Sequence, residues 1–471
     1  MGRGTHRIRL LAVLFGAALT LRLVPVLLTR DLGIALDDMF QYDALAESMR
    51  LGQGYTWYGG IPTAARAPLY PLFLAIIYSL FGHQFLTARI VQAIVGSFLP
   101  VVVYVLGRGM FEERVARIAA WVVVVYPLFL VYPLALATEN LFFLLVPLMI
   151  LCLLRAMDTS RRAYYLLAGL LLGMSILTRS AIAGFVVLIL PWLWYYGSSR
   201  TEALKNWIVI VLCVAALTVP WSIRNSLLHG QFVFVESALG FHFYLGHHPD
   251  GIGTFDSDTA VGFLEEIGAL DEPNLETEIV AHNLGTERGL GFILEDPGGA
   301  AWLLVSKLSH FLRLDKRAAL YFYSNNFLGE LAPLILLLVL LVICLPWVVV
   351  LLLSVIGMSF TEVNRGNMLI YLLFVYFVGI HVLIMAEPRF HLVLVPFLAV
   401  LAARGATALA QVKDNLHTSD LKLRRATRWR FALCSVVIVL LVLNWIYELN
   451  VDLDNLRTLF APGGNLARFT Y

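Results

Sequence analysis

Long apolar runs separated by short polar loops are the dominant pattern of this chain. A helix needs roughly 20 apolar residues to cross a bilayer core, and runs near this length recur along the sequence. Apolar length alone predicts about eleven membrane-spanning helices. They lie at residues 8–29, 88–107, 115–135, 140–157, 164–178, 180–196, 206–222, 331–355, 367–386, 389–409 and 431–447.

Residues 68–82 form a shorter apolar run whose first turn contains Pro68 and Pro71. This length is typical of an interfacial or re-entrant helix, although the sequence leaves open whether the run crosses the membrane. If it does not cross, the basic loops all share one side of the membrane. These loops are 108–117, 155–162, 197–205 and 411–430. Cytoplasmic loops are rich in Lys and Arg, so the charge pattern favours this topology and a cytoplasmic N-terminus.

The same topology places the polar segments on one outer face. They are 36–71, 138–140, 223–330 and 387–389. The 223–330 segment contains turn-forming clusters and an amphipathic stretch at 300–314, which predicts a partly helical extracytoplasmic region. Residues that are distant in sequence are therefore expected to meet on that face.

Composition agrees with a membrane protein. The chain has 471 residues, of which 60% are hydrophobic and 14% charged, whereas a soluble domain is about 45–50% apolar and 25% charged. We predict an all-α polytopic membrane protein. The four cysteines lie far apart in apolar runs, so no disulfide framework is expected. Membrane orientation explains the basic loop 411–430, and no nucleic-acid partner is expected.

An adjacent acid pair, Asp37 and Asp38, follows the first predicted span. A short helix is expected from there, because Tyr42 and three other apolar residues fall on one face before two glycines end it. One acid is explained as a helix N-cap. Only one cap is needed, and ionisable groups at a lipid boundary are costly and usually functional. The pair is therefore a candidate catalytic position.

Further charged residues are predicted on the same face. Each arginine there is either an interfacial anchor or a ligand for an anionic headgroup, because Arg binds phosphate in a bidentate manner. Glu139 is either a site carboxylate or a favourable charge at a helix N-terminus. The candidates are Arg66, Glu139, Arg179, Arg224, Asn225, Glu387 and Arg389. His247 and His248 lie in a turn without a third ligand at a diagnostic spacing, which argues against zinc.

These residues resemble the integral-membrane GT-C glycosyltransferases, in the branch that contains protein O-mannosyltransferases, aminoarabinose transferases and rhizobial core transferases. The resemblance rests on an ordered series of short motifs. It begins with Asp38, Tyr42 and Ala46 (D-x3-Y-x3-A), and covers residues 8–225 well and the later spans loosely. The other motifs are G-x-G-Y at 52–55, R-x-P-L-Y-P at 66–71, GRGMF at 107–111, TEN at 138–140, LTR at 177–179, PWSIRN at 220–225 and RFHLVLVP at 389–396.

The resemblance implies inverting transfer of a sugar from a polyprenyl-phosphate-linked donor to a glycan, lipid or protein acceptor. Asp38 would be the catalytic base, with Asp37 as the alternative and Glu139 near a second acidic position of the family. No cofactor is implied, and a divalent metal stays open. Membrane lipids are the remaining expected partners. Substrate-binding residues would be Tyr42, Arg66, Tyr70, Arg179, Arg224, Asn225, Glu387 and Arg389.

The expected organisation has four parts. Residues 1–225 would form the catalytic transmembrane module, whose outer loop 30–87 carries the active site. Residues 226–330 would be the extracytoplasmic region, 331–447 the C-terminal spans and 448–471 an outer tail. We expect a multi-pass plasma-membrane protein with an extracytoplasmic site. A transporter or lipid flippase is the main alternative, although transporters typically hold charges near the midplane between internal repeats. A non-catalytic membrane subunit is the third.

Overall fold

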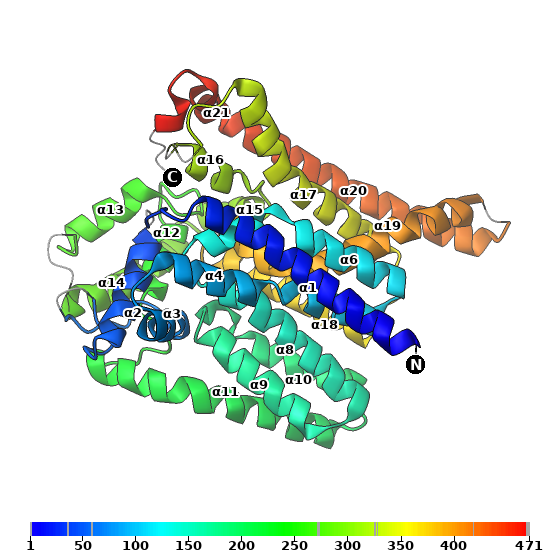
Figure 1. Cartoon of the computed structure of the whole chain (residues 1–471), viewed down its shortest axis with the longest axis horizontal. Coiled ribbons are helices and arrows are strands. Elements are labelled where there is room, and N and C mark those ends of the chain that lie inside the picture. The colour runs from blue at the N-terminus through cyan, green and yellow to red at the C-terminus, as the bar shows by residue number, and fades with distance from the viewer. Residues whose placement is uncertain are drawn as a thin grey trace.

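The computed structural model describes residues 2–34, 37–57, 60–270, 274–324, 326, 328–417 and 419–467. Every regular element in these ranges is a helix, and the single β-bridge joins Thr56 to Pro62. The all-α prediction is therefore confirmed. The helices lie side by side in a bundle, with short helices collected at one end (Figure 1).

Eight helical segments in the described ranges are long and apolar enough to cross a membrane. They are α1 (Gly2–Leu28), α4 with α5 (Phe85–Gly96, Leu99–Met110), α8 (Glu139–Thr159), α11 (Arg200–His229), α17 (Pro333–Ser359), α18 (Arg365–Leu383), η3 with α19 (Pro388–Leu394, Val395–His417) and α20 (Leu421–Val451). A ninth is obtained if α6 (Glu113–Val125) and the α7–η1 segment (Pro127–Val131, Tyr132–Leu134), bent by 51°, form one span. The chain is a multi-pass membrane protein.

The expected count of eleven spans is not confirmed. The predicted spans 164–178 and 180–196 correspond to α9 (Arg162–Ile176) and to η2 with α10 (Ser180–Ile182, Phe185–Tyr196). These helices are shorter than a full crossing, because the polar turn Thr178–Ser180 interrupts the apolar sequence between them. Residues 68–82 form α3 (Leu69–Phe81), a 13-residue helix in the same length class.

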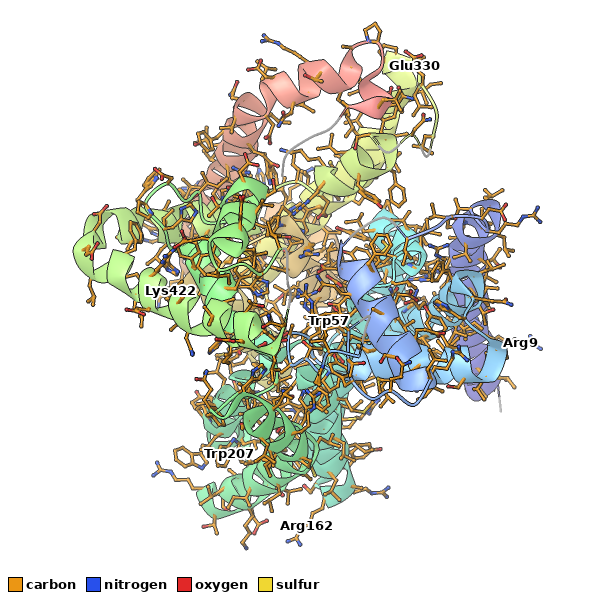
Figure 2. The ribbon with its side chains drawn as sticks, turned by 90° about the vertical axis from the view of Figure 1, so that its left-hand side faces the viewer. Arg9, Trp57, Arg162, Trp207, Glu330 and Lys422 are labelled. Carbon is orange, nitrogen blue, oxygen red and sulfur yellow. The ribbon has the colours of Figure 1, made fainter. Side chains whose placement is uncertain are left out.

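The helices of the polar loops, all but α14 of 15 residues or fewer, form the end of the bundle that we call the site end. They are α2 (Asp37–Arg50), α3, α12 (Leu239–Gly246), α13 (Ser257–Glu266), α14 (Leu275–Glu295) and α15 (Pro297–Phe311). Figure 2 looks onto this end and places Trp57 near its centre, with α2 on one side and α12–α14 on the other. The C-terminal part adds α16 (Lys316–Ser324), α21 (Leu453–Phe460) and η4 (Gly464–Leu466).

The α2 helix has the predicted amphipathic pattern. Leu45 and Ala46 are fully buried, and Tyr42 is 8% exposed. Tyr42 and Ala46 share a buried apolar cluster with Tyr70 and Leu74 of α3. Gly52 and Gly54 follow the helix with positive φ angles of 76° and 84°, a backbone conformation that glycine adopts without steric cost. The loop from Gly52 to Pro68 then returns over the site end.

The α19 helix occupies the interior of the bundle. Within its most apolar window 78% of the residues are buried, compared with 22% for α17 and 17% for α11. It crosses α17 closely through two glycines. A Cβ built on Gly405 would lie 2.1 Å from the Leu353 carbonyl oxygen, and one on Gly357 would lie 2.0 Å from that of Leu401. Small residues allow such close backbone approach between membrane helices.

We predict that Gly405→Ala destabilises the protein by roughly 1–3 kcal/mol, because the added methyl group forces α17 and α19 apart. Gly379→Ala on α18 is the matched control, since a Cβ there meets no atom within 4 Å. It should leave the protein unchanged or slightly stabilised, as alanine favours a helix. Thermal unfolding of the purified variants measures both effects. Equal melting temperatures would contradict the close crossing.

Candidate active site

Asp38 lies in the first turn of α2, and its carboxylate contacts two arginines from distant segments. Arg66 Nη2 is 2.8 Å from Oδ1, and Arg389 Nη1 is 3.2 Å from Oδ2. Arg66 also donates from Nε to Gln41 Oε1 at 2.7 Å, one helical turn along α2. The carboxylate is therefore held as an ion-pair partner, which is more than a helix cap requires. The side chain of Asp37 lies outside the described residues.

Arg389 connects Asp38 to a second, fully buried carboxylate. Its Nε is 2.7 Å from Glu387 Oε2, and Arg317 Nη1 is 3.1 Å from the same oxygen. Glu387 is only 1% exposed. A buried carboxylate is stable only when positive charge or hydrogen bonds compensate for lost water. The result is a continuous chain of charges, Asp38–Arg389–Glu387–Arg317.

A second ion pair lies beside this chain. Glu139, the first residue of α8, is buried and lies 2.5 Å from Arg179 Nη1. The guanidinium of Arg179 is 5.2 Å from the centroid of the Phe390 ring, and that of Arg389 is 5.5 Å from the same centroid. Both cations thus contact one aromatic ring, which brings the two ion pairs into a single cluster.

The cluster contains four arginines and three carboxylates, namely Arg66, Arg179, Arg317, Arg389, Asp38, Glu139 and Glu387. The ion pairs alone balance as 4 − 3, and Glu236, whose charge also acts on Arg66, brings the count to 4 − 4.

Electrostatic effects keep the carboxylates of Asp38 and Glu387 ionised. Burial alone would raise the pKa of Asp38, but the charges of Arg66 and Arg389 outweigh it and hold the pKa well below its ordinary value. Burial also acts to raise the pKa of Glu387, and Arg389 with Arg317 lowers it overall. Nearby cations favour the charged form of an acid. Both side chains are therefore anionic at neutral pH.

Two tyrosines and one histidine border the acid. The rings of Tyr42 and Tyr70 meet edge to face at 5.2 Å, and the Arg66 guanidinium lies 6.0 Å from the Tyr42 ring. Tyr70 donates to Gln92 Oε1 at 2.5 Å. The histidine is His242 on α12, which lies in none of the motifs identified in the sequence. Burial, and next the charge of Arg66, lower its pKa to about 4, so its ring is neutral.

Arg224 and Asn225, expected to bind substrate, make contacts that support the loop. Arg224 donates to the backbone oxygens of Thr63 and Tyr55, the latter at 3.2 Å. Asn225 donates to the Val235 oxygen at 2.9 Å. The structure therefore does not bring these two residues into the Asp38 cluster. The span end at α11 fixes the backbone of the loop that carries Arg66.

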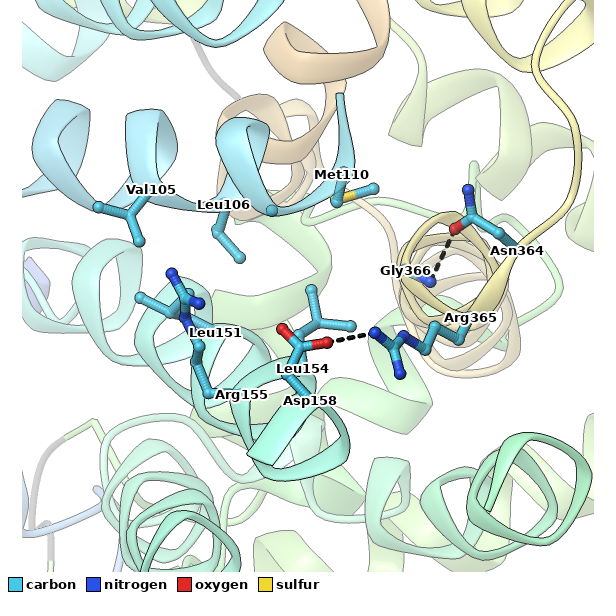
Figure 3. Close-up of a pocket in the computed structure, with 11 residues that line it drawn as sticks. Val105, Leu106, Met110, Leu151, Leu154, Arg155, Asp158, Asn364, Arg365 and Gly366 are labelled. Carbon is cyan, nitrogen blue, oxygen red and sulfur yellow. Dashed lines mark hydrogen bonds and ion pairs between the residues drawn. The ribbon is translucent and has the colours of Figure 1, made fainter. Parts of the chain in front are cut away.

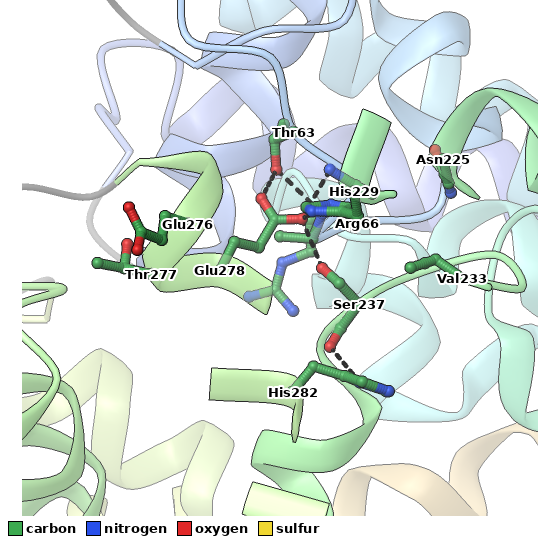
Figure 4. A network of polar contacts seen from close by, with 12 residues as sticks. Thr63, Arg66, Asn225, His229, Val233, Ser237, Glu276, Thr277, Glu278 and His282 are labelled. Atoms are coloured by element: carbon green, nitrogen blue, oxygen red, sulfur yellow. Dashed lines mark hydrogen bonds and ion pairs between the residues drawn. The ribbon is translucent and has the colours of Figure 1, made fainter. Parts of the chain in front are cut away.

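Glu278 on α14 was not among the residues selected from the sequence. It binds the same loop from the side of the 226–330 region (Figure 4). Its carboxylate accepts hydrogen bonds from Thr63 Oγ1 at 2.5 Å, the Ala64 N–H at 2.9 Å and Ser237 Oγ at 2.6 Å, and lies 3.0 Å from His229 Nε2. Groups from three segments thus converge on one acid. Only the tertiary structure reveals this, because nothing in the α14 sequence distinguishes Glu278 from its neighbours.

The consecutive residues Asp315, Lys316 and Arg317 form a further support that the sequence did not indicate. Asp315 Oδ1 is 3.2 Å from His391 Nε2, and Arg317 contacts Glu387. Both flanks of Arg389 are therefore tied to one short segment. Lys316 anchors that segment to α20 through Glu448 at 2.7 Å. His391 itself is fully buried and stacks on Trp347 at 3.6 Å.

We predict that Glu278→Gln loosens the 60–67 loop and destabilises the protein by roughly 2–3 kcal/mol at neutral pH, because charge-assisted hydrogen bonds are lost. Hydrogen exchange of 60–67 and thermal unfolding measure these effects. Burial acts to raise the pKa of Glu278, and hydrogen bonds from His229, Ser237 and Thr63 lower it overall from 4.5.

The sign of the pH dependence follows from this lowered pKa. The stabilising contribution is present above the ordinary value and disappears as the pH falls through the folded-state pKa. The difference in stability between wild type and Glu278→Gln should therefore become smaller at acidic pH. Glu276→Gln, at an exposed position two residues earlier, is the control. Equal protection of residues 60–67 from hydrogen exchange in all three proteins would argue against a role of Glu278 in holding this loop.

Comparison with known proteins gives one family and a set of similar structures. Residues 65–223, about a third of the chain, match the family described as dolichyl-phosphate-mannose-protein mannosyltransferase. No curated protein sequence matches the chain. The archaeal oligosaccharyltransferase AglB from Archaeoglobus fulgidus, in complex with an inhibitory peptide and a dolichol-phosphate, is similar with a TM-score of 0.50 and 16% identity. The alignment covers 93% of this chain and 54% of AglB.

A second similar structure is ArnT from Cupriavidus metallidurans bound to undecaprenyl phosphate, with a TM-score of 0.49 and 13% identity. The alignment covers 99% of this chain and 74% of ArnT. The chain spans about half the length of AglB, and at this level of identity the likeness concerns the fold. The family match falls on the segment that carries Arg66, Glu139 and Arg179. The resemblance predicted from the motifs is confirmed: this chain is a multi-pass membrane protein with the GT-C glycosyltransferase fold.

Proposed function

We propose that the protein is an inverting glycosyltransferase that moves a sugar from a polyprenyl-phosphate-linked donor to an acceptor on the outer face of the plasma membrane. The observation that carries this proposal is the ionised Asp38 held between Arg66 and Arg389. The family match to transferases that use dolichyl-phosphate-mannose supports it. The dolichol-phosphate in the similar AglB structure supports a lipid phosphate as the donor's leaving group.

In this reaction Asp38 acts as the general base. It accepts the proton of an acceptor hydroxyl while that oxygen attacks the anomeric carbon of the sugar. The bond from the anomeric carbon to the phosphate oxygen breaks, and its electron pair leaves with the lipid phosphate. Positive side chains then stabilise the charge that develops on this phosphate. Arg66 and Arg389 are suited to the task because a guanidinium binds phosphate in a bidentate manner.

The ion pairs around Asp38 suggest how donor binding activates the base. With both arginines on the carboxylate, its pKa lies below the ordinary range and Asp38 is a weak base. A donor phosphate competes for Arg66 and Arg389. Each contact that moves from carboxylate to phosphate raises the pKa of Asp38 and strengthens it as a base. Acceptor deprotonation is thereby coupled to the presence of donor.

The remaining cluster residues have supporting roles in this proposal. Glu139 holds Arg179, and Glu387 holds Arg389. Tyr42 and Tyr70 supply an aromatic wall beside Arg66, suited to the apolar face of a sugar. The catalytic module would be 1–225, followed by the extracytoplasmic region 226–330, the spans 331–447 and the tail 448–471.

The charge distribution supports the proposed orientation. The basic loops 108–117 and 155–162 lie at the opposite ends of α5 and α8 from the site. By the positive-inside rule those loops face the cytoplasm, so the site faces outward. Transport by a flippase is less favoured, because these ionisable groups gather at one end of the bundle instead of its midplane.

We predict that Asp38→Asn lowers turnover of a polyprenyl-phosphate-linked sugar by roughly 10²–10⁴-fold, the usual contribution of a general base. Release of polyprenyl phosphate by the purified protein, in the presence of acceptor, is the measurement. Asp37→Asn is the neighbouring control and should retain most activity. Full turnover in Asp38→Asn would exclude this residue as the general base. Loss of turnover only in Asp37→Asn would assign that role to Asp37.

We also predict that Arg66→Gln shifts the acid limb of the kcat/KM profile to higher pH. Arg66 lowers the pKa of Asp38, so its removal raises that pKa, and the carboxylate is lost at a higher pH as the solution is acidified. Arg66→Lys keeps the positive charge and should leave the limb close to that of wild type. An unchanged limb in Arg66→Gln would show that Asp38 is not the group that titrates.

A further inference from the structure

A small cavity lies at the other end of the bundle from Asp38. Its volume is about 150 Å³. Figure 3 shows that the last turns of α5 and α8 and the first turn of α18 surround it. The lining residues are Val105, Leu106, Gly109, Met110, Leu151, Leu154, Arg155, Asp158, Asn364, Arg365 and Gly366.

The cavity is separate from the candidate active site. Along α8, Glu139 of the Asp38 cluster and Asp158 of the cavity are 19 residues apart. At 1.5 Å per residue this corresponds to roughly 28 Å, close to the thickness of a bilayer core. The α18 helix runs in the opposite direction and connects the same two places, since it begins at the cavity and ends just before Glu387. The two sites therefore lie at opposite membrane boundaries.

Two arginines give the cavity its charge. Arg365 forms an ion pair with Asp158 across the space between α18 and α8. Arg155, one turn before Asp158, extends toward α5 along the cavity wall. Among the described residues no carboxylate pairs with the Arg155 guanidinium. Two cations and one carboxylate leave one net positive charge at the cavity.

The rest of the lining determines which anion fits. Leu106 of α5 lies across the cavity from Leu151 and Leu154 of α8, with Arg155 at one side and Arg365 at the other. The amides of Gly366 and Asn367 already donate to the Asn364 side chain. The helix N-terminus is therefore capped, and the arginines are the available donors. A group with a charged phosphate beside an apolar portion matches this combination.

We propose that this cavity binds the headgroup phosphate of an anionic phospholipid. Its place at a membrane boundary puts it at the level of lipid headgroups, and basic pockets between membrane helices bind such headgroups. The Arg155 guanidinium contacts the phosphate oxygens, and the leucines contact the glycerol and upper acyl region. A lipid held here joins the ends of α5, α8 and α18. A free phosphate has the same charge chemistry and lacks only the apolar part.

The test compares full-length protein in nanodiscs of phosphatidylcholine alone with nanodiscs that contain a fifth phosphatidylglycerol. We expect phosphatidylglycerol to raise the Tm of wild type by roughly 2–4 °C, as a ligand of the folded state does. Arg155→Gln should lose this rise. Gly109→Leu should also lose it, because it adds bulk at a lining position where a Cβ meets no atom within 4 Å, while the arginines stay in place.

Arg161→Gln is the matched control, because it removes an exposed arginine of the same loop that does not line the cavity. It should keep the full rise. An equal rise in all four proteins, or equal losses in Arg155→Gln and Arg161→Gln, would overturn the proposal in favour of general surface charge. Inorganic phosphate is added to phosphatidylcholine nanodiscs in a parallel arm. A full rise there would show that free phosphate, not a lipid, is the ligand. None of these readouts depends on glycosyl transfer.

Discussion

The contact between Asp38 and Arg389 is the constraint on which the site depends, because it joins the first polar loop to a helix near the other end of the chain. Arg389 also neutralises Glu387, which is buried and would be unstable without that charge. One guanidinium therefore serves two carboxylates from two segments. Moving either segment would leave a charge without compensation in a low-dielectric region, so the arrangement is mutually enforcing.

The surrounding elements hold this contact by a division of tasks. Arg66 must lie close to α2. Its loop is held by a hydrogen bond from Arg224 of α11 and by another to Glu278 of α14. Arg389 must reach the same carboxylate, and its flanks are fixed by Asp315 and Arg317. The supports are polar because the loops have little apolar surface to bury. Hydrogen bonds to buried charged groups are strong where water is excluded.

Much of the candidate site could be predicted, since Asp38, Arg66, Glu139, Arg179 and Arg389 were all selected from the sequence and lie in one cluster. Charge at a membrane boundary is costly, so each such residue is conspicuous in an apolar sequence. His242, Glu278 and Arg317 were missed because the 223–330 segment is polar throughout, and one charge there does not stand out. Arg224 and Asn225 were conspicuous for the same reason, yet they bind the backbone of the neighbouring loop.

The sequence by itself determined the helical class and the membrane setting, because apolar run length is a local property. It did not determine the number of crossings, since a polar turn shortens α9 and α10 below a full span. Only the tertiary structure decided which arginine meets which carboxylate. Ion pairs between segments depend on how helices pack, and that packing relies on close contacts, such as Gly357 with Leu401, that no local pattern encodes.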